Sequence, residues 1–195
     1  MINGFYADFA SSSVGSRKNY PIPVTGKFRG KIGDESLFVN SLDSRMDYDS
    51  IFEVVKESVR YVTGKERSGI GLALSDLPST LGAYWQVGGN YIVMNENLVR
   101  AMLKLSGSER EFNSFIYMIL AHEYIHSLGY IDEMEAREMT AKVARAAFGE
   151  KHHAARMSAG DVWTMYPQLK YAGSGNGSSL RIVSKFDSSA TSYIA

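Results

Sequence analysis

The stretch LAHEYIHSLGYIDEMEAREMT, from Leu120 to Thr140, carries the most informative pattern in the chain. It contains two of the four histidines, His122 and His126, with Glu123 between them. Residues four apart lie on the same face of an α-helix, so both imidazoles can reach one ion. The spacing therefore predicts a metal site on a single helical turn.

The surrounding residues predict the helix itself. Ser108 and Glu111 form a capping-box pattern, and Gly129 is typical of a helix end. The flanking residues are mostly apolar and uncharged. A buried imidazole or carboxylate without a partner is costly, so these side chains need a role. Hydrogen bonds to core neighbours are one such role, and the residue types favour the other, a metal site.

The chain has no cysteine, so thiolate metal sites, disulfides and a cysteine nucleophile are excluded. A metal must therefore be held by His, Asp, Glu or water. Zinc bound to His122 and His126 would lower the pKa of a coordinated water to near neutrality. Glu123 lies beside the two histidines and is expected to act as the general base.

The run HEYIHSLGYID resembles the zincin metallopeptidases, and its extension is similar to the metzincin pattern H-E-x-x-H-x-x-G-x-x-H. His122, Glu123, His126 and Gly129 match this pattern. Asp132 stands where metzincins have the third histidine, which is similar to the snapalysin-type zincins. The run from Asp132 to Arg137 also resembles small archaeal zincins of uncertain substrate. The resemblance implies one catalytic zinc ion with Asp132 as the third ligand.

Other residues could supply the third ligand. In gluzincins it is a glutamate on the neighbouring helix, which would correspond to Glu135 here. Glu138, and then His152 or His153, are further alternatives. His152 and His153 also have a structural explanation. They lie near the C-terminus of the second predicted helix, where a cation is favourable.

The carboxylates at the start of that helix also fit a purely structural role. Asp132 is a favoured N-cap residue, and Glu135 could be its capping-box partner. Glu133 is expected to be an exposed charge that the helix dipole favours. The identity of the third ligand therefore stays open between these residues.

Three more features follow from the resemblance. The segment WTMYP resembles the Met-turn that lies beneath the metal in metzincins, with Met165 as the methionine. Tyr166 is a candidate stabiliser of an oxyanion. Zincins also have an edge strand that pairs with an extended peptide substrate, and the segment YIVMNENL, residues 91–98, is the candidate for it.

The remaining segments predict an α+β fold. Apolar residues recur at helical spacing in residues 47–64, and residues 69–79 indicate a buried strand. Two aromatic and β-branched runs flank Gly88-Gly89-Asn90, which is typical of a hairpin. A second helix is expected from Asp132 to Gly149. The predicted fold is zincin-like: a small mixed sheet with an active-site helix followed by a second helix.

We expect one metallopeptidase domain over residues 1–172. Residues 1–45 are mixed in composition and could form a covering or pro-like segment. Residues 173–195 are rich in Gly and Ser and are expected to form a flexible tail.

The composition limits the classes of partner. Hydrophobic residues make up 45% of the chain, which is enough for a sizeable core. Lys plus Arg and Asp plus Glu both number 21, so there is no basic footprint for nucleic acid. No signal peptide or membrane-spanning segment is apparent, and a cytoplasmic location is expected.

These observations favour a zinc-dependent metallopeptidase, an endopeptidase acting on a peptide or protein substrate. Glu123 would take a proton from the attacking water and pass it to the leaving amine. The alternative is a catalytically silent or latent protein of the zincin fold that serves as a binding module. A helical protein without a metal is the third interpretation.

Overall fold

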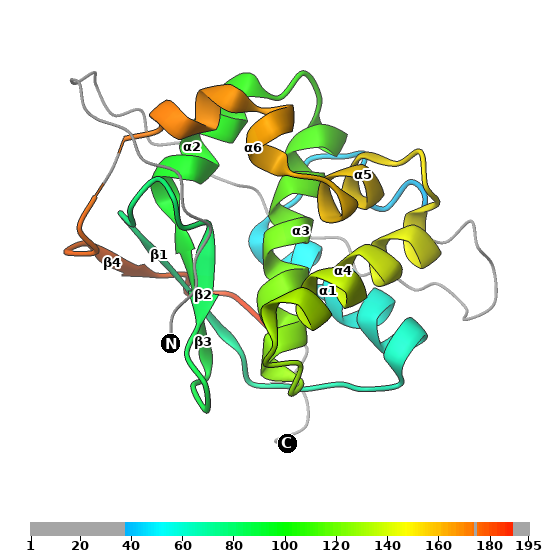
Figure 1. The fold of residues 1–195 in the computed structure, drawn as a ribbon. Helices are drawn as coiled ribbons and strands as arrows, with labels where there is room; N and C mark the ends of the chain where they lie inside the picture. The colour runs from blue at the N-terminus through cyan, green and yellow to red at the C-terminus, as the bar shows by residue number, and fades with distance from the viewer. Residues whose placement is uncertain (1–37, 174, 189–195) are drawn as a thin grey trace.

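The structure is a computed structural model that describes residues 38–173 and 175–188. Over these residues the chain forms six α-helices, a short 3-10 helix and a four-stranded mixed sheet, in agreement with the predicted α+β class (Figure 1). Residues 1–37, most of the predicted covering segment, lie outside the described residues. The elements are α1 (Tyr48–Thr63), β1 (Gly71–Ser75), β2 (Ala83–Trp85), β3 (Tyr91–Asn95), α2 (Glu96–Leu105), α3 (Glu109–Ser127), α4 (Glu133–Phe148), α5 (His153–Ala159), α6 (Val162–Met165), η1 (Pro167–Tyr171) and β4 (Leu180–Ile182).

Helix α3 lies at the centre of the molecule, between the sheet and helices α1, α4 and α5 (Figure 1). Most of its residues are buried, because several elements pack around it. Tyr117 and Tyr124 are fully buried in this helix and satisfy their hydroxyl groups with Ser58 and the backbone of Arg67. None of the helices in the described part of the chain is long and apolar enough to cross a membrane.

The sheet has the strand order β2-β3-β1-β4. Strands β1 and β3 are parallel, and the outer strands β2 and β4 each run antiparallel to their neighbour. The resulting hairpin of β2 and β3 confirms the turn predicted at Gly88–Asn90. Because β3 is an internal strand, the prediction that it is the edge strand for a substrate is wrong. The edge on the α3 side is β2, which contacts that helix directly.

Helix ends form where the sequence predicts them. The Ser108 hydroxyl accepts the Glu111 N–H at the start of α3, and the Glu111 carboxylate accepts the Gly107 N–H. At the other end, Gly129 has a φ of 101°, a conformation that favours glycine. The chain turns back there, so α4 begins close to the end of α3.

Arg67 joins the hairpin to the C-terminal end of α3. Its guanidinium donates to the Ser127 carbonyl at 3.2 Å and to the Gly89 carbonyl at 2.9 Å. Trp85 donates its indole N–H to the same Gly89 carbonyl at 2.8 Å. These contacts hold strand β2 at a set position beside α3.

Part of the predicted flexible tail belongs to the fold. Strand β4 lies within residues 173–195 and pairs with β1, and Asp187 is buried. The Asp187 carboxylate pairs with Lys56 and accepts the backbone N–H groups of Gly69 and Ile70. Gly and Ser content predicted mobility here, whereas contacts with residues more than a hundred positions earlier order the segment.

Candidate metal centre

Helix α3 presents His122 and His126 on one face, one turn apart. Their Nε2 atoms lie 3.2 Å from each other, and the ring planes are nearly perpendicular. Both side chains are 15% exposed, so they are open to a small ligand but sheltered from bulk water. The helical spacing therefore brings the two imidazoles together, as the sequence predicted.

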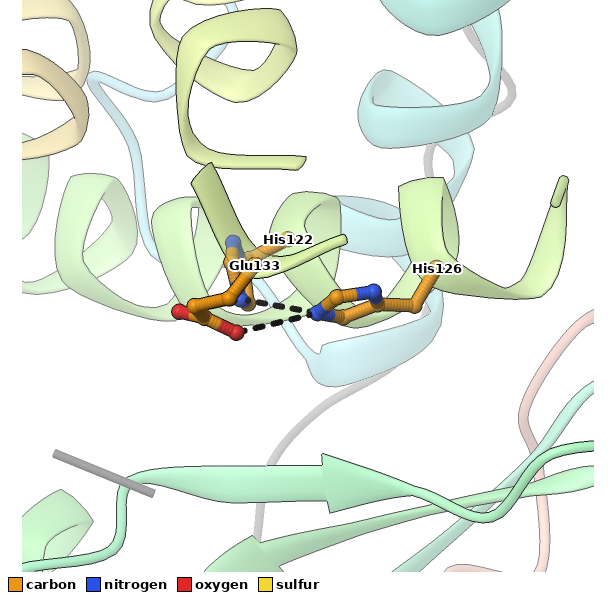
Figure 2. A group of neighbouring side chains, drawn as sticks. All are labelled: His122, His126 and Glu133. Atoms are coloured by element: carbon orange, nitrogen blue, oxygen red, sulfur yellow. Dashed lines mark hydrogen bonds and ion pairs between the residues drawn. The ribbon is translucent and has the colours of Figure 1, made fainter. Parts of the chain in front are cut away.

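The carboxylate that meets these histidines is Glu133, the first residue of α4. Its Oε1 lies 3.4 Å from the His122 Nε2, and its Oε2 lies 3.4 Å from the His126 Nε2 (Figure 2). In a helix the side chains tilt toward the N-terminus, so Glu133 extends back toward the end of α3. Among the described residues, His122, His126 and Glu133 are the group of three that could hold a metal ion.

The separation of the donor atoms fits a tetrahedral zinc site. Bonds of about 2.0–2.1 Å at tetrahedral angles place ligand atoms about 3.3–3.4 Å apart. Here the two histidine Nε2 atoms are 3.2 Å apart, and each lies 3.4 Å from a different oxygen of the Glu133 carboxylate. Two histidines with one glutamate are also a ligand set found in catalytic zinc sites, which leaves one coordination position for water or substrate.

Two further contacts orient the candidate ligands. The His126 Nδ1 lies 2.7 Å from the Tyr130 carbonyl oxygen. A carbonyl only accepts, so Nδ1 carries the hydrogen, and the neutral ring has its lone pair on Nε2, toward the other ligands. The Glu133 Oε1 accepts a hydrogen bond of 2.8 Å from the Arg137 Nε. Partners of this kind are typical around metal ligands.

The contacts of Glu133 shift two pKa values in this group, its own and that of His126. Burial would raise the pKa of Glu133, but its contacts with His122, His126 and Arg137 hold that pKa well below its usual range. The contact with Glu133 raises the pKa of His126 against the opposing effect of burial. The carboxylate is therefore ionised at neutral pH, as a metal ligand must be.

Glu123 lies beside this group and is 6% exposed. Burial raises the pKa of its carboxyl group, whereas the nearby His122 and His126 lower it. The carboxylate accepts the backbone N–H of Trp85 in strand β2. A buried, oriented carboxylate with a raised pKa has the properties of a general base that works near neutral pH.

A cleft with a volume of about 860 Å³ opens over these residues. Strand β2 borders it on one side, and the face of α3 with His122, Glu123 and His126 forms another wall. The beginning of α4, together with residues of α5, α6 and η1, completes the lining. The volume lies in the range of small-molecule and substrate sites.

Asp132, the sequence-based choice for the third ligand, is not in the group of three. Its Oδ1 accepts the Glu135 N–H at 2.9 Å, so it is the N-cap of α4. Glu135 and Glu138 are exposed and also lie outside the group. The sequence did not point to Glu133 as a ligand. A glutamate at the first position of a helix is already explained as a surface charge that the helix dipole favours. Asp132 also had a predicted role as N-cap, and preference for that role would have left Glu133 as the next carboxylate along the chain.

Met165 and Tyr166 are not among the described residues that line the cleft. The Tyr166 hydroxyl donates to the Glu111 Oε1 at 2.5 Å, at the start of α3, which engages its proton away from the candidate metal ligands. Met165 packs against the core. Met157 lines the cleft instead. In the structure Tyr166 therefore links α6 to the start of α3, and Met165 has a packing role.

His152 is also remote from the group. It is 7% exposed, stacks on Phe148, and its Nδ1 accepts the Ala154 N–H as the N-cap of α5. His153 is the first residue of α5 and lies outside the group too. Neither histidine therefore competes for the role of third ligand.

Family models, curated proteins and solved structures gave no match.

The buried His152 predicts a loss of stability in acid. Burial lowers the pKa of His152 to about 4, whereas an unfolded histidine has a pKa of about 6.5. Between these values the unfolded state binds a proton that the folded state does not, so stability falls as the pH falls. At about 1.4 kcal/mol per pH unit, the total loss by pH 4 is about 3 kcal/mol.

Urea denaturation of the wild type and of His152→Asn at pH 7, 5.5 and 4.5 measures this effect. Asparagine can still cap α5 but does not titrate, so the stability of the variant should depend less on pH over this range. His153→Asn is the matched control and should behave as the wild type does. Equal pH dependence in wild type and His152→Asn would refute the assignment to His152.

Proposed function

We propose that the protein is a zinc-dependent peptidase of the zincin type, in which His122, His126 and Glu133 hold the metal. The observation that carries this proposal is the convergence of two histidine nitrogens and one carboxylate group, 3.2 to 3.4 Å apart, beside a buried glutamate. The resemblance of the run HEYIHSLG to zincins supports it independently.

Zinc bound to these residues would supply a Lewis acid at the scissile carbonyl and would lower the pKa of the attacking water. Glu123 accepts the proton of that water and then delivers it to the leaving nitrogen. The Trp85 N–H holds the Glu123 carboxylate in place. Arg137 and the Tyr130 carbonyl orient Glu133 and His126 through their hydrogen bonds.

Strand β2 supports a peptide as the substrate. The Asn95 N–H donates to the Gly82 carbonyl, which sets the alternation of hydrogen bonds between β2 and β3. By this alternation the backbone N–H and carbonyl groups of Ala83 and Trp85 point away from β3. The contact of the Trp85 N–H with Glu123 on α3 is consistent with this direction. The N–H and carbonyl of Ala83 would then be available to pair with an extended peptide that adds to the edge.

Metal content tests the first step of this proposal. Plasma mass spectrometry of protein purified without a histidine tag should find about one zinc per chain, a consequence of the three-ligand site. His122→Ala should lose most of this zinc, and His153→Ala, the matched control, should keep it. No zinc in the wild type after incubation with the metal would refute the proposal and would favour a hydrogen-bonded cluster.

Hydrolysis of a fluorogenic peptide library tests the second step. The zinc-loaded protein should cleave peptides, stop when a chelator removes the metal, and recover when zinc is restored. Zinc binding without hydrolysis of any peptide would favour the alternative function, a protein of this architecture that binds a partner without turnover.

A further inference from the structure

Arg67 lies in the link between α1 and β1 and contacts both α3 and the β2–β3 hairpin, the two elements that border the cleft at the candidate ligands. Its Nη1 donates to the carbonyl of Ser127, the last residue of α3, at 3.2 Å. Its Nη2 donates to the Gly89 carbonyl at 2.9 Å and to the Asn90 Oδ1 at 2.8 Å, both in the turn of the hairpin. One planar guanidinium therefore bridges the helix with the histidines and the hairpin with the edge strand.

The backbone of Arg67 is fixed to α3 as well. The Arg67 N–H donates to the Tyr124 hydroxyl at 2.8 Å, and that hydroxyl donates to the Arg67 carbonyl at 3.0 Å. Tyr124 is fully buried and follows Glu123 directly in α3. The guanidinium therefore extends to the hairpin from a backbone position that the helix itself holds in place.

Trp85 joins this bridge to the proposed general base. Its indole N–H donates to the same Gly89 carbonyl at 2.8 Å, and the Arg67 Cζ lies 5.4 Å from the centre of a Trp85 ring. The backbone N–H of Trp85 donates to the Glu123 carboxylate. Arg67 and the hairpin turn thus hold the side chain of Trp85, and the backbone of Trp85 holds Glu123.

Strand β2 is an element that benefits from such a tie. It has three residues and pairs with one neighbour in the described sheet, β3. A short edge strand opens more easily than an internal one, because one of its sides has no strand to hold it. The hydrogen bonds of Arg67 connect the turn after β2 directly to the end of α3, which limits how far the two can separate.

We propose that Arg67 is a positioning residue for the reaction at the candidate metal centre, where it acts through Trp85 to hold Glu123 and strand β2 at the spacing that hydrolysis requires. The proposal rests on the proposed peptidase function and adds to it a residue that is not among the described residues lining the cleft. Reacting groups must be held within about 0.5 Å of their productive geometry. A displacement of about 1 Å can reduce the rate about 100-fold.

Steady-state kinetics of the zinc-loaded wild type, Arg67→Ala and Arg67→Lys test the effect on the reaction. Arg67→Ala should lower kcat by about 10- to 100-fold with an unchanged zinc content. Arg67→Lys should recover only part of this loss, because one ammonium group does not reproduce the planar set of donors. Arg60→Ala is the matched control and should keep the wild-type kcat. Arg60 is an exposed arginine of α1 that forms a surface ion pair with Glu66.

Amide hydrogen exchange on the full chain tests the structural link and needs no activity. Arg67 does not bond to the Trp85 backbone N–H, so a change at that amide reports coupling through the Trp85 side chain. In Arg67→Ala this amide should exchange about 10-fold faster or more. The Asn95 N–H, which donates to the Gly82 carbonyl between the same two chain segments, is the internal control and should change little. A general loss of stability would accelerate both amides together.

The outcomes separate this inference from the proposed function. A wild type that cleaves peptides, with an equal kcat in Arg67→Ala, would overturn the inference and leave the peptidase function standing. Equal acceleration of the Trp85 and Asn95 amides, or no acceleration, would also overturn it, because Arg67 would then affect stability alone or nothing at the site. A zinc-loaded wild type that cleaves no peptide would refute the peptidase function, and the role of Arg67 in the reaction would be withdrawn with it.

Discussion

Replacement of Glu123 by glutamine is expected to reduce kcat for peptide hydrolysis by about 10³-fold while zinc content stays at one ion per chain. Glutamine has nearly the same size and can still accept the Trp85 N–H, so the buried site should keep its shape. Its amide cannot take a proton from water. The loss therefore measures the general-base step apart from metal binding.

Steady-state kinetics and zinc analysis on the same protein preparation check this prediction. Glu135→Gln is the matched control, because Glu135 is an exposed glutamate of the neighbouring helix outside the candidate ligand group. It should retain wild-type activity. If Glu123→Gln kept full activity with zinc bound, Glu123 would not be the base, and the proposed mechanism would be wrong.

Replacement of Glu133 by alanine is expected to weaken zinc binding on the order of 100-fold or more, because it removes one of three protein ligands. Asp132→Asn should change zinc affinity little. Asparagine caps a helix about as well as aspartate, so the start of α4 should persist in that variant. The two adjacent carboxylates therefore differ sharply in their predicted effect.

Competition with a chromophoric chelator measures both affinities, and circular dichroism verifies that each variant is folded. The opposite pattern, with zinc lost in Asp132→Asn and retained in Glu133→Ala, would identify Asp132 as the ligand. It would also mean that the turn between α3 and α4 rearranges when the metal binds, because Asp132 now hydrogen-bonds to the Glu135 N–H.

Local pattern determined a large part of the candidate site. The period of α3, the capping residues Ser108 and Glu111, and Gly129 at its end are all short-range features. They were enough to predict the helix and to bring His122 and His126 onto one face. The hairpin at Gly88–Asn90 and the Asp132 cap of α4 were also predictable, because each depends on a few neighbouring residues.

The same local pattern could not choose the carboxylate that meets the histidines. Asp132, Glu133 and Glu135 all lie within the first turn of α4 or its cap, and their spacing from His126 differs by only three residues. The choice depends on the angle at which α4 leaves the turn after Gly129. Packing of α4 against α1, α3 and α5 sets that angle, and the contacts with α1 join residues far apart in sequence.

Tertiary structure likewise decided the order of the strands and the content of the C-terminal segment. Strand propensity does not reveal which strand lies at the edge of a sheet. The sequence therefore suggested β3 as the edge strand beside the site, whereas the edge strand is β2. Composition predicted a mobile tail. In the structure, strand β4 pairs with β1 and Asp187 is buried, so this part of the tail belongs to the fold. The sequence by itself determined the helix, the histidine pair and the position of Glu123 beside it, because their geometry repeats within one turn. Only the tertiary structure selected Glu133 and strand β2, because the direction of α4 and the order of the strands depend on packing between elements.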